Sequence, residues 1–133
     1  MPKNKDDCNE DKNTYKLRVP KDISLPFFAY DVFKQGQIAF SRIEDYIDEE
    51  NSISDVEVNY PLNMVNGVPY LFKNYNQYYS TQGSLIYFKR ENAYEAYDII
   101  SKSKSFKMYK WDTIKDKYTH MKMNVLVANK KIC

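Results

Sequence analysis

The segment from Phe28 to Gln37 holds the residues of this chain whose types and spacing best suit ligand binding. It reads Phe-Ala-Tyr-Asp-Val-Phe-Lys-Gln-Gly-Gln, leaving an apolar strand pattern at Tyr30 and passing Gly36 before a segment of helical periodicity. A turn from a strand into a helix leaves backbone N–H groups unpaired, and such groups suit an anionic ligand. We therefore predict a binding loop at Tyr30–Gly36. Within it, Asp31 either binds a cationic group or caps the turn, and a cap or turn role is the commoner one.

Three carboxylates lie on a second segment with helical periodicity. Glu91, Glu95 and Asp98 are spaced by four and three residues, so they would share one helix face. Such a triplet suits acid–base chemistry or a metal, although a solvated acidic face is the commoner explanation. His120 is the sole histidine, and the two cysteines are Cys8 and Cys133. We therefore expect no zinc site, no Cys–His nucleophile and no cofactor.

Two further sets of side chains suit recognition. A tyrosine-rich segment either recognises a partner or folds over the mouth of the domain. A lysine-rich segment, interleaved with aromatic residues, either binds single-stranded nucleic acid or a phosphorylated small molecule, or protects an edge strand, which we favour. The tyrosines are Tyr70, Tyr75, Tyr78 and Tyr79, and the lysines are Lys102, Lys104, Lys107, Lys110, Lys115 and Lys117.

The elements that would position these residues follow an α+β order. Leu25–Tyr30 is apolar on both faces and is expected to be a central strand. The whole order favours a mixed, strongly curved or barrel-like sheet with short helices. Further strands are predicted around Val56–Val58 and over Gly83–Phe88, Phe106–Ile114 and Met121–Ala128, helices over Gln37–Ile47 and Glu91–Ile100, and a hairpin at Asn66-Gly67.

Length and composition describe one domain. The chain has 133 residues, and we expect a flexible tail over residues 1–19 followed by a single domain over 20–133. A net charge of +2 makes nucleic acid an unlikely main partner. The absence of a long apolar run and of a secretory signal predicts a cytoplasmic protein without membrane contact. The bias toward Lys, Asn, Ile and Tyr is typical of AT-rich genomes and favours a low-GC bacterium or one of its phages.

The Tyr30–Gly36 loop resembles the signature of the gamma-glutamylcyclotransferase-like family, Tyr-Gly-(Ser/Thr)-Leu-x-x-Gly. Tyr30 and Gly36 match this pattern, while Asp31, Val32 and Phe33 replace its glycine, its Ser or Thr and its leucine. Weaker similarities follow in the family's order, and together they cover about Leu25 to Ala128. They are Tyr60-Pro61-Leu62, the strand from Gly83 to Tyr87, the Tyr97-Asp98 pair and Tyr109.

The resemblance implies an enzyme that releases 5-oxoproline from γ-glutamyl substrates, with a glutamate three residues after the Leu-Asp pair as the proton shuttle. Ser101 stands at that place here. Asp31 would also lie beside the substrate carboxylate, and two like charges about 4 Å apart repel by roughly 4 kcal/mol at an effective dielectric of about 20. Both changes point to a pseudoenzyme.

The resemblance therefore implies a degenerate domain that binds a small molecule or a protein, as an accessory or inhibitor protein of a mobile element. Its ligand-binding residues would be Tyr30, Asp31, Val32, Phe33, Gly36, Ser101 and Tyr109. The alternative is an active cyclotransferase on a variant γ-glutamyl substrate, in which Glu95, Asp98 or Asp31 supplies the missing carboxylate.

Overall fold

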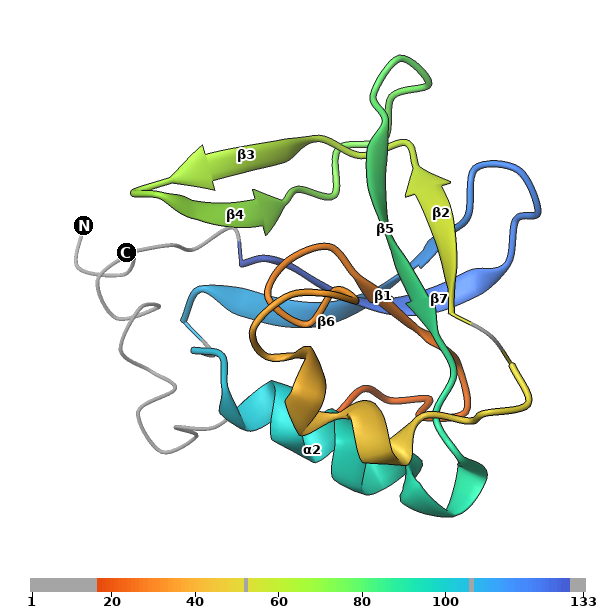
Figure 1. Ribbon diagram of the computed structural model, residues 1–133. Helices are drawn as coiled ribbons and strands as arrows, with labels where there is room; N and C mark the ends of the chain where they lie inside the picture. Colours follow the sequence, from red (N-terminus) through yellow and green to blue (C-terminus); the bar gives the residue numbers. More distant parts are fainter. Residues whose placement is uncertain (1–16, 52, 106, 130–133) are drawn as a thin grey trace.

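The computed structural model describes residues 17–51, 53–105 and 107–129, which form an α+β fold with a mixed five-stranded sheet and a two-stranded sheet (Figure 1). The predicted α+β class is therefore confirmed. The strands are β1 (Phe27–Ala29), β2 (Ser54–Val58), β3 (Leu62–Val65), β4 (Val68–Leu71), β5 (Thr81–Ile86), β6 (Tyr109–Lys115) and β7 (Lys122–Ala128). The helix is α2 (Ala93–Lys102), and the 3-10 helices are η1 (Phe40–Arg42), η2 (Glu44–Tyr46) and η3 (Arg90–Asn92).

The five-stranded sheet has the order β2-β5-β1-β7-β6, so β1 is central, as its apolar pattern predicts. β1 runs antiparallel to β5 and parallel to β7. Both of its faces are buried: Phe27 and Ala29 lie in one apolar cluster, and Phe28 and Tyr30 lie in another. The first cluster is the one that α2 covers, through Tyr97 and Ile100.

Over the described residues the five-stranded sheet does not close into a barrel. Its edges are β2 and β6. The turn after β6 reaches toward the opposite edge, where the Lys117 N–H donates to the carbonyl oxygen of Glu57 at 2.8 Å. The sheet therefore stays open where a barrel would close, because one turn contact takes the place of a complete strand ladder between β2 and β6.

The predicted helix over Gln37–Ile47 is wrong, since this segment forms η1 and η2 instead. Its hydrogen bonds join residues three apart, as from the Ile43 N–H to the Phe40 oxygen at 3.1 Å. The two ends of the segment are held by tertiary contacts: the Ala39 N–H donates to the Val32 oxygen, and Ile47 forms a bridge with Phe88. Between such fixed ends the short chain follows the core surface rather than one continuous helix.

The hairpin predicted at Asn66-Gly67 is confirmed as β3 and β4. Both turn residues have positive φ, 54° and 79°, as a two-residue hairpin turn requires. Pro69 lies opposite Met64. Counting from the turn, this pair exchanges no ladder hydrogen bonds, so the missing N–H of Pro69 costs the hairpin nothing.

The expected tail over residues 1–19 lies mostly outside the described residues, as do Cys8 and Cys133. Its last part, Leu17 and Val19, packs against the apolar cluster that α2 covers. Within the described part of the chain, no helix has the length and apolar character needed to span a membrane.

Candidate functional site

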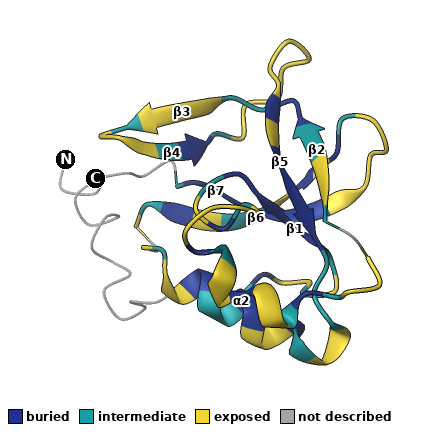
Figure 2. Ribbon diagram, in the orientation of Figure 1, coloured by how far each residue is buried: buried dark blue, intermediate teal, exposed yellow. Residues whose placement is uncertain are grey.

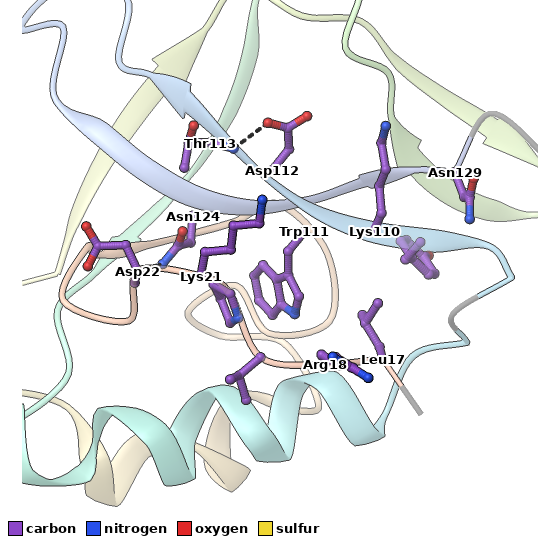
Figure 3. Close-up of a pocket in the computed structure, with 13 residues that line it drawn as sticks. Leu17, Arg18, Lys21, Asp22, Lys110, Trp111, Asp112, Thr113, Asn124 and Asn129 are labelled. Atoms are coloured by element: carbon purple, nitrogen blue, oxygen red, sulfur yellow. Dashed lines mark hydrogen bonds between the residues drawn. The ribbon is translucent and has the colours of Figure 1, made fainter. Parts of the chain in front are cut away.

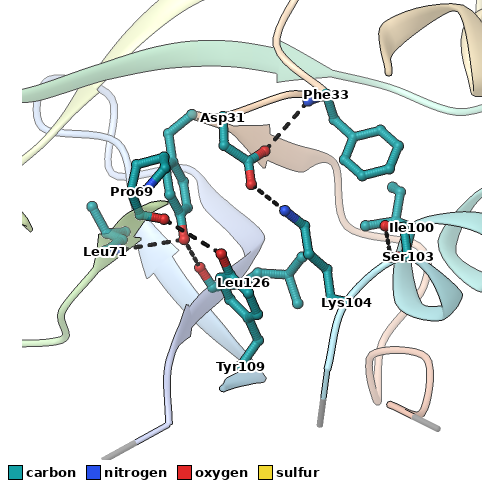
Figure 4. Close-up of polar contacts among 10 residues, drawn as sticks. Asp31, Phe33, Pro69, Leu71, Ile100, Ser103, Lys104, Tyr109 and Leu126 are labelled. Carbon is teal, nitrogen blue, oxygen red and sulfur yellow. Dashed lines mark hydrogen bonds and ion pairs between the residues drawn. The ribbon is translucent and has the colours of Figure 1, made fainter. Parts of the chain in front are cut away.

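The loop from Tyr30 to Gly36 contains a buried ion pair that joins it to the segment after α2. The Lys104 Nζ lies 2.6 Å from the Asp31 Oδ2, and the two side chains are 11% and 6% exposed (Figure 4). The ammonium also lies over the Tyr109 ring, 4.9 Å from its centroid. The negative charge of Asp31 is therefore neutralised from within the chain, which corrects the expectation that Asp31 would repel an anion.

Three consecutive backbone N–H groups of the loop, those of Phe33, Lys34 and Gln35, are paired within the protein instead of being open to an anion. The Phe33 N–H donates to the Oδ1 of the Asp31 carboxylate at 3.3 Å, and the Lys34 N–H donates to the backbone carbonyl oxygen of Asp31 at 2.9 Å. The Gln35 N–H donates to the Ser84 hydroxyl at 3.3 Å. Asp31 thus caps the turn through Oδ1, as the commoner alternative predicts, while its Oδ2 is paired with Lys104 of the same chain rather than with a ligand.

The other residues of the loop separate into an inner and an outer set. Phe33 is fully buried, with its ring 5.9 Å from the Lys104 Nζ. Val32 is 39% exposed, and Gly36 is exposed with a φ of 89°. Of these three predicted binding residues, only Phe33 contacts the ion pair.

Tyr30 and Tyr109 both lie beside the edge of β4 that faces away from β3, and their hydroxyls form hydrogen bonds with the β4 backbone there. The Tyr30 hydroxyl donates to the Leu126 oxygen at 2.6 Å and accepts the Leu71 N–H at 3.2 Å. The Tyr109 hydroxyl donates to the Pro69 oxygen at 3.4 Å. Two phenols therefore satisfy outward-facing polar groups of β4 and attach the hairpin to the main sheet.

Burial raises the pKa of both phenols above the ordinary value of a tyrosine. The nearby Asp31 carboxylate raises both pKa values further. Each hydroxyl accordingly keeps its proton near neutral pH, as its role as a hydrogen-bond donor requires. Neither phenol is tuned to act as a general base.

Ser101, at the place of the family's glutamate, lies elsewhere in the core. It is fully buried on α2, accepts the Trp111 Nε1–H at 2.9 Å and donates to the Arg18 oxygen at 3.3 Å. Trp111 also lines a pocket of about 810 Å³ between residues 17–22 and the β6–β7 pair, bordered by Tyr109 (Figure 3). Ser101 thus joins three segments of the fold. Its carbonyl oxygen accepts the Lys104 N–H at 3.2 Å, while its hydroxyl is bonded to Trp111 and Arg18 rather than to the Asp31–Lys104 ion pair.

The two candidate catalytic carboxylates do not reach the loop. Glu95 is exposed on α2, and Asp98 forms an ion pair of 2.8 Å with Lys102 one turn along the same helix. Nowhere in the described residues do three His, Cys, Asp or Glu side chains gather in a way that could hold a metal ion. These carboxylates therefore belong to a solvated helix face.

The residues of the tyrosine-rich and lysine-rich segments do not form continuous surfaces, because in each segment some side chains are buried or paired and others are exposed. Tyr70 is buried and stacks on Tyr109, with ring centroids 4.8 Å apart, whereas the other three tyrosines are exposed. Among the lysines, Lys102 and Lys104 are held in ion pairs. Lys110 and Lys115 are exposed on β6, an edge strand, as the protective role predicts.

Sequence reasoning missed Lys104 as the partner of Asp31. The alternating Ser and Lys residues around it are typical of a solvated loop, and only its place beside Tyr109 and Phe33 buries the side chain. One signal was available, because a carboxylate predicted in a binding loop needs a cation if the loop is buried.

No family model, curated protein or solved structure matches this chain.

Proposed function

We propose that this chain is a gamma-glutamylcyclotransferase-like domain without cyclotransferase activity, which acts as a protein-binding accessory protein. Three features support the loss of activity. The N–H groups of Phe33, Lys34 and Gln35 are paired within the protein, the Asp31–Lys104 ion pair lies inside the loop, and Ser101 is a structural residue. A γ-glutamyl substrate would find neither a free anion site nor a carboxylate to move its amine proton.

The observation that carries the binding proposal is the outer edge of β3. Counting from the two-residue turn, the N–H and C=O groups of Leu62 and Met64 point away from β4. Among the described residues no hydrogen bond reaches these groups. The opposite edge of the hairpin, in contrast, is closed by Tyr30 and Tyr109.

The other edges of the protein carry the charges that discourage strand addition, and β3 does not. β2 contains Asp55 and Glu57, and β6 contains lysines at both ends, whereas β3 reads Leu-Asn-Met-Val. An uncharged open edge is a template for another strand, and proteins use such edges to bind extended segments of partners.

The surface around β3 is also depleted in charge. In a chain with 29% charged residues, Lys73 is the single charged side chain between Glu57 and Lys89. Exposed apolar side chains nonetheless gather there, and Figure 2 shows that β3 and the loop before β5 are largely exposed. Depletion of charge with exposed tyrosine and methionine is typical of interface cores. The exposed residues are Leu62, Met64, Val68, Tyr75, Tyr78 and Tyr79.

The catalytic half of the proposal is tested by 5-oxoproline release from γ-glutamyl amino acids and γ-glutamylamines. We expect no turnover above the protein-free rate. Turnover would contradict it, and a hundredfold loss in Glu95→Gln or Asp98→Asn would then identify the carboxylate responsible.

The binding half is tested by affinity capture from extracts with the Met64→Lys variant. A lysine on β3 should abolish capture of any partner that adds a strand, because it places a charge in the centre of the interface. Ser54→Lys, which puts the same charge on the edge strand β2, is the matched control. Amide hydrogen exchange should then show protection of Leu62 and Met64 in the complex. Equal capture by both variants, or unchanged exchange at β3, would contradict the proposal.

A further inference from the structure

Four lysines line one small pocket at the end of the β6–β7 hairpin. The pocket has a volume of about 250 Å³, and its lysines are Lys73, Lys115, Lys117 and Lys122. We call it the lysine pocket. It lies away from the β3 edge and from the Asp31–Lys104 pair, since neither contributes to its wall. The net charge of the whole chain is only +2, so this is a local concentration of positive charge.

Two of these lysines face each other across the sheet. Lys115 on β6 is directly opposite Lys122 on β7. Like charges at directly opposed positions destabilise a sheet. Among the described residues neither ammonium has a carboxylate within 4.0 Å. The pKa of the Asp22 carboxyl is lowered chiefly by hydrogen bonds from Ser24, and Lys122 makes a smaller contribution. An anion bound between the two lysines would relieve their repulsion.

Among the described residues, the carboxylates around the pocket leave three of its four lysines without a close ion-pair partner. Asp116 is the single carboxylate in the wall, and its Oδ2 already accepts the N–H groups of Tyr118 and Thr119 and the Thr119 hydroxyl. Glu57 lies 3.9 Å from the Lys117 Nζ, at the outer limit of an ion pair. Within the described part of the chain, Lys73 is the one lysine of these four with a close partner, Asp112 at 2.7 Å.

The far wall of the pocket is aromatic and is held in place. Tyr60 and Tyr75 meet edge to face, with ring centroids 5.8 Å apart. Asn59, in the same wall, donates from its amide to the oxygens of Gln77 and Tyr79 at 3.3 and 3.0 Å, which fixes the loop carrying Tyr75. A preformed wall lowers the entropic cost of binding.

We propose that the lysine pocket binds a compact phosphorylated ligand, with its phosphate oxygens between Lys115, Lys117 and Lys122. Lysine is a common point-charge partner of phosphate. The volume suits a group the size of pyrophosphate, since pockets for larger ligands begin at about 300 Å³. A nucleic acid strand would need a longer basic groove. That groove is interrupted here, because Lys102 and Lys104 are held by Asp98 and Asp31.

The test is calorimetric titration of the full chain with inorganic pyrophosphate, at low salt and at about 0.15 M salt. We expect saturable binding of one pyrophosphate per chain, weaker at the higher salt. The double variant Lys115→Gln/Lys122→Gln should lose at least tenfold in affinity. Lys107→Gln/Lys110→Gln removes the same charge from exposed positions outside the pocket and should stay within twofold.

Thermal unfolding supplies an independent readout. Without ligand, Lys115→Gln should raise the Tm, because it removes one of two opposed like charges. Pyrophosphate should raise the Tm of the wild type and of the control, and leave that of the pocket double variant unchanged. Absence of binding to the wild type, or equal losses in both double variants, would overturn the proposal. So would binding of a single-stranded oligonucleotide without binding of pyrophosphate.

Discussion

The Asp31 carboxylate and the Lys104 ammonium form a buried ion pair, 2.6 Å apart, between a loop after the central strand and the segment after α2. The pair lies in the loop where the sequence predicts ligand binding, and the charge of Asp31 is neutralised there by a lysine of the same chain. The ammonium is held on three sides, by the carboxylate and by the rings of Phe33 and Tyr109. Because the carboxylate and the ammonium neutralise each other, the pair has no net charge with which to attract a charged substrate.

Removing one member of this pair should destabilise the protein strongly. Lys104→Met leaves Asp31 buried without its cation, so we expect the free energy of unfolding to fall by about 3 kcal/mol. The double variant Asp31→Asn/Lys104→Met should regain part of that loss, because it leaves no unpaired charge. Urea unfolding of Lys104→Met, of Asp31→Asn and of the double variant measures the coupling. Strictly additive losses would contradict a direct interaction.

Tyr30→Phe should loosen the hairpin while leaving the main sheet intact. The phenol hydroxyl bridges the Leu126 oxygen and the Leu71 N–H, so its removal leaves both groups unpaired. We expect a loss of about 1–2 kcal/mol and faster amide exchange at Leu71. Tyr94→Phe removes a hydroxyl from an exposed tyrosine and should change neither quantity. Unchanged exchange at Leu71 in Tyr30→Phe would show that this bond does not hold β4.

Gly83→Ala should be costly, although alanine is a better strand residue than glycine. A Cβ at this position would lie 2.6 Å from the Ala29 oxygen and 2.7 Å from the Phe28 ring. Because the backbone oxygen cannot move away without breaking the β1–β5 pairing, we expect a loss of about 2–3 kcal/mol. At Gly67 no atom lies within 4 Å of a new Cβ, so Gly67→Ala should cost only the strain of its positive φ. Equal losses at the two sites would contradict the close packing of β1 on β5.

Stability should fall in acid through Asp116. Burial by itself would raise the pKa of this carboxyl, but hydrogen bonds from Thr119 and Tyr118 outweigh burial and lower the pKa below its ordinary value of 3.8. A pKa that is lower in the folded state stabilises the fold above the unfolded value, and this contribution disappears as the pH falls through the folded value.

The Asp116→Asn variant isolates this effect. The difference in unfolding free energy between the wild type and the variant should be constant near neutral pH and shrink below about pH 4. A wild-type advantage that persists unchanged to about pH 2 would contradict the role of these hydrogen bonds.

Local patterns predicted the elements well where one interaction dominates. The apolar run around Phe27 and Phe28 predicted a central strand, because both faces of such a strand must be buried. Asn66-Gly67 predicted a hairpin, because few other residues accept positive φ at both turn positions. The helix over Gln37–Ile47 was mispredicted, because contacts at its two ends outweigh a weak apolar periodicity.

The sequence by itself determined the α+β class, the central strand, the hairpin and the poor fit of Ser101 to acid–base chemistry, since these depend on residue types and short spacings. Only the tertiary structure decided that Lys104 neutralises Asp31, that Tyr30 and Tyr109 close one edge of the hairpin, and that Lys115 faces Lys122. These relationships join segments distant along the chain. No local pattern contains them, because strand register and chain crossing decide which side chains meet.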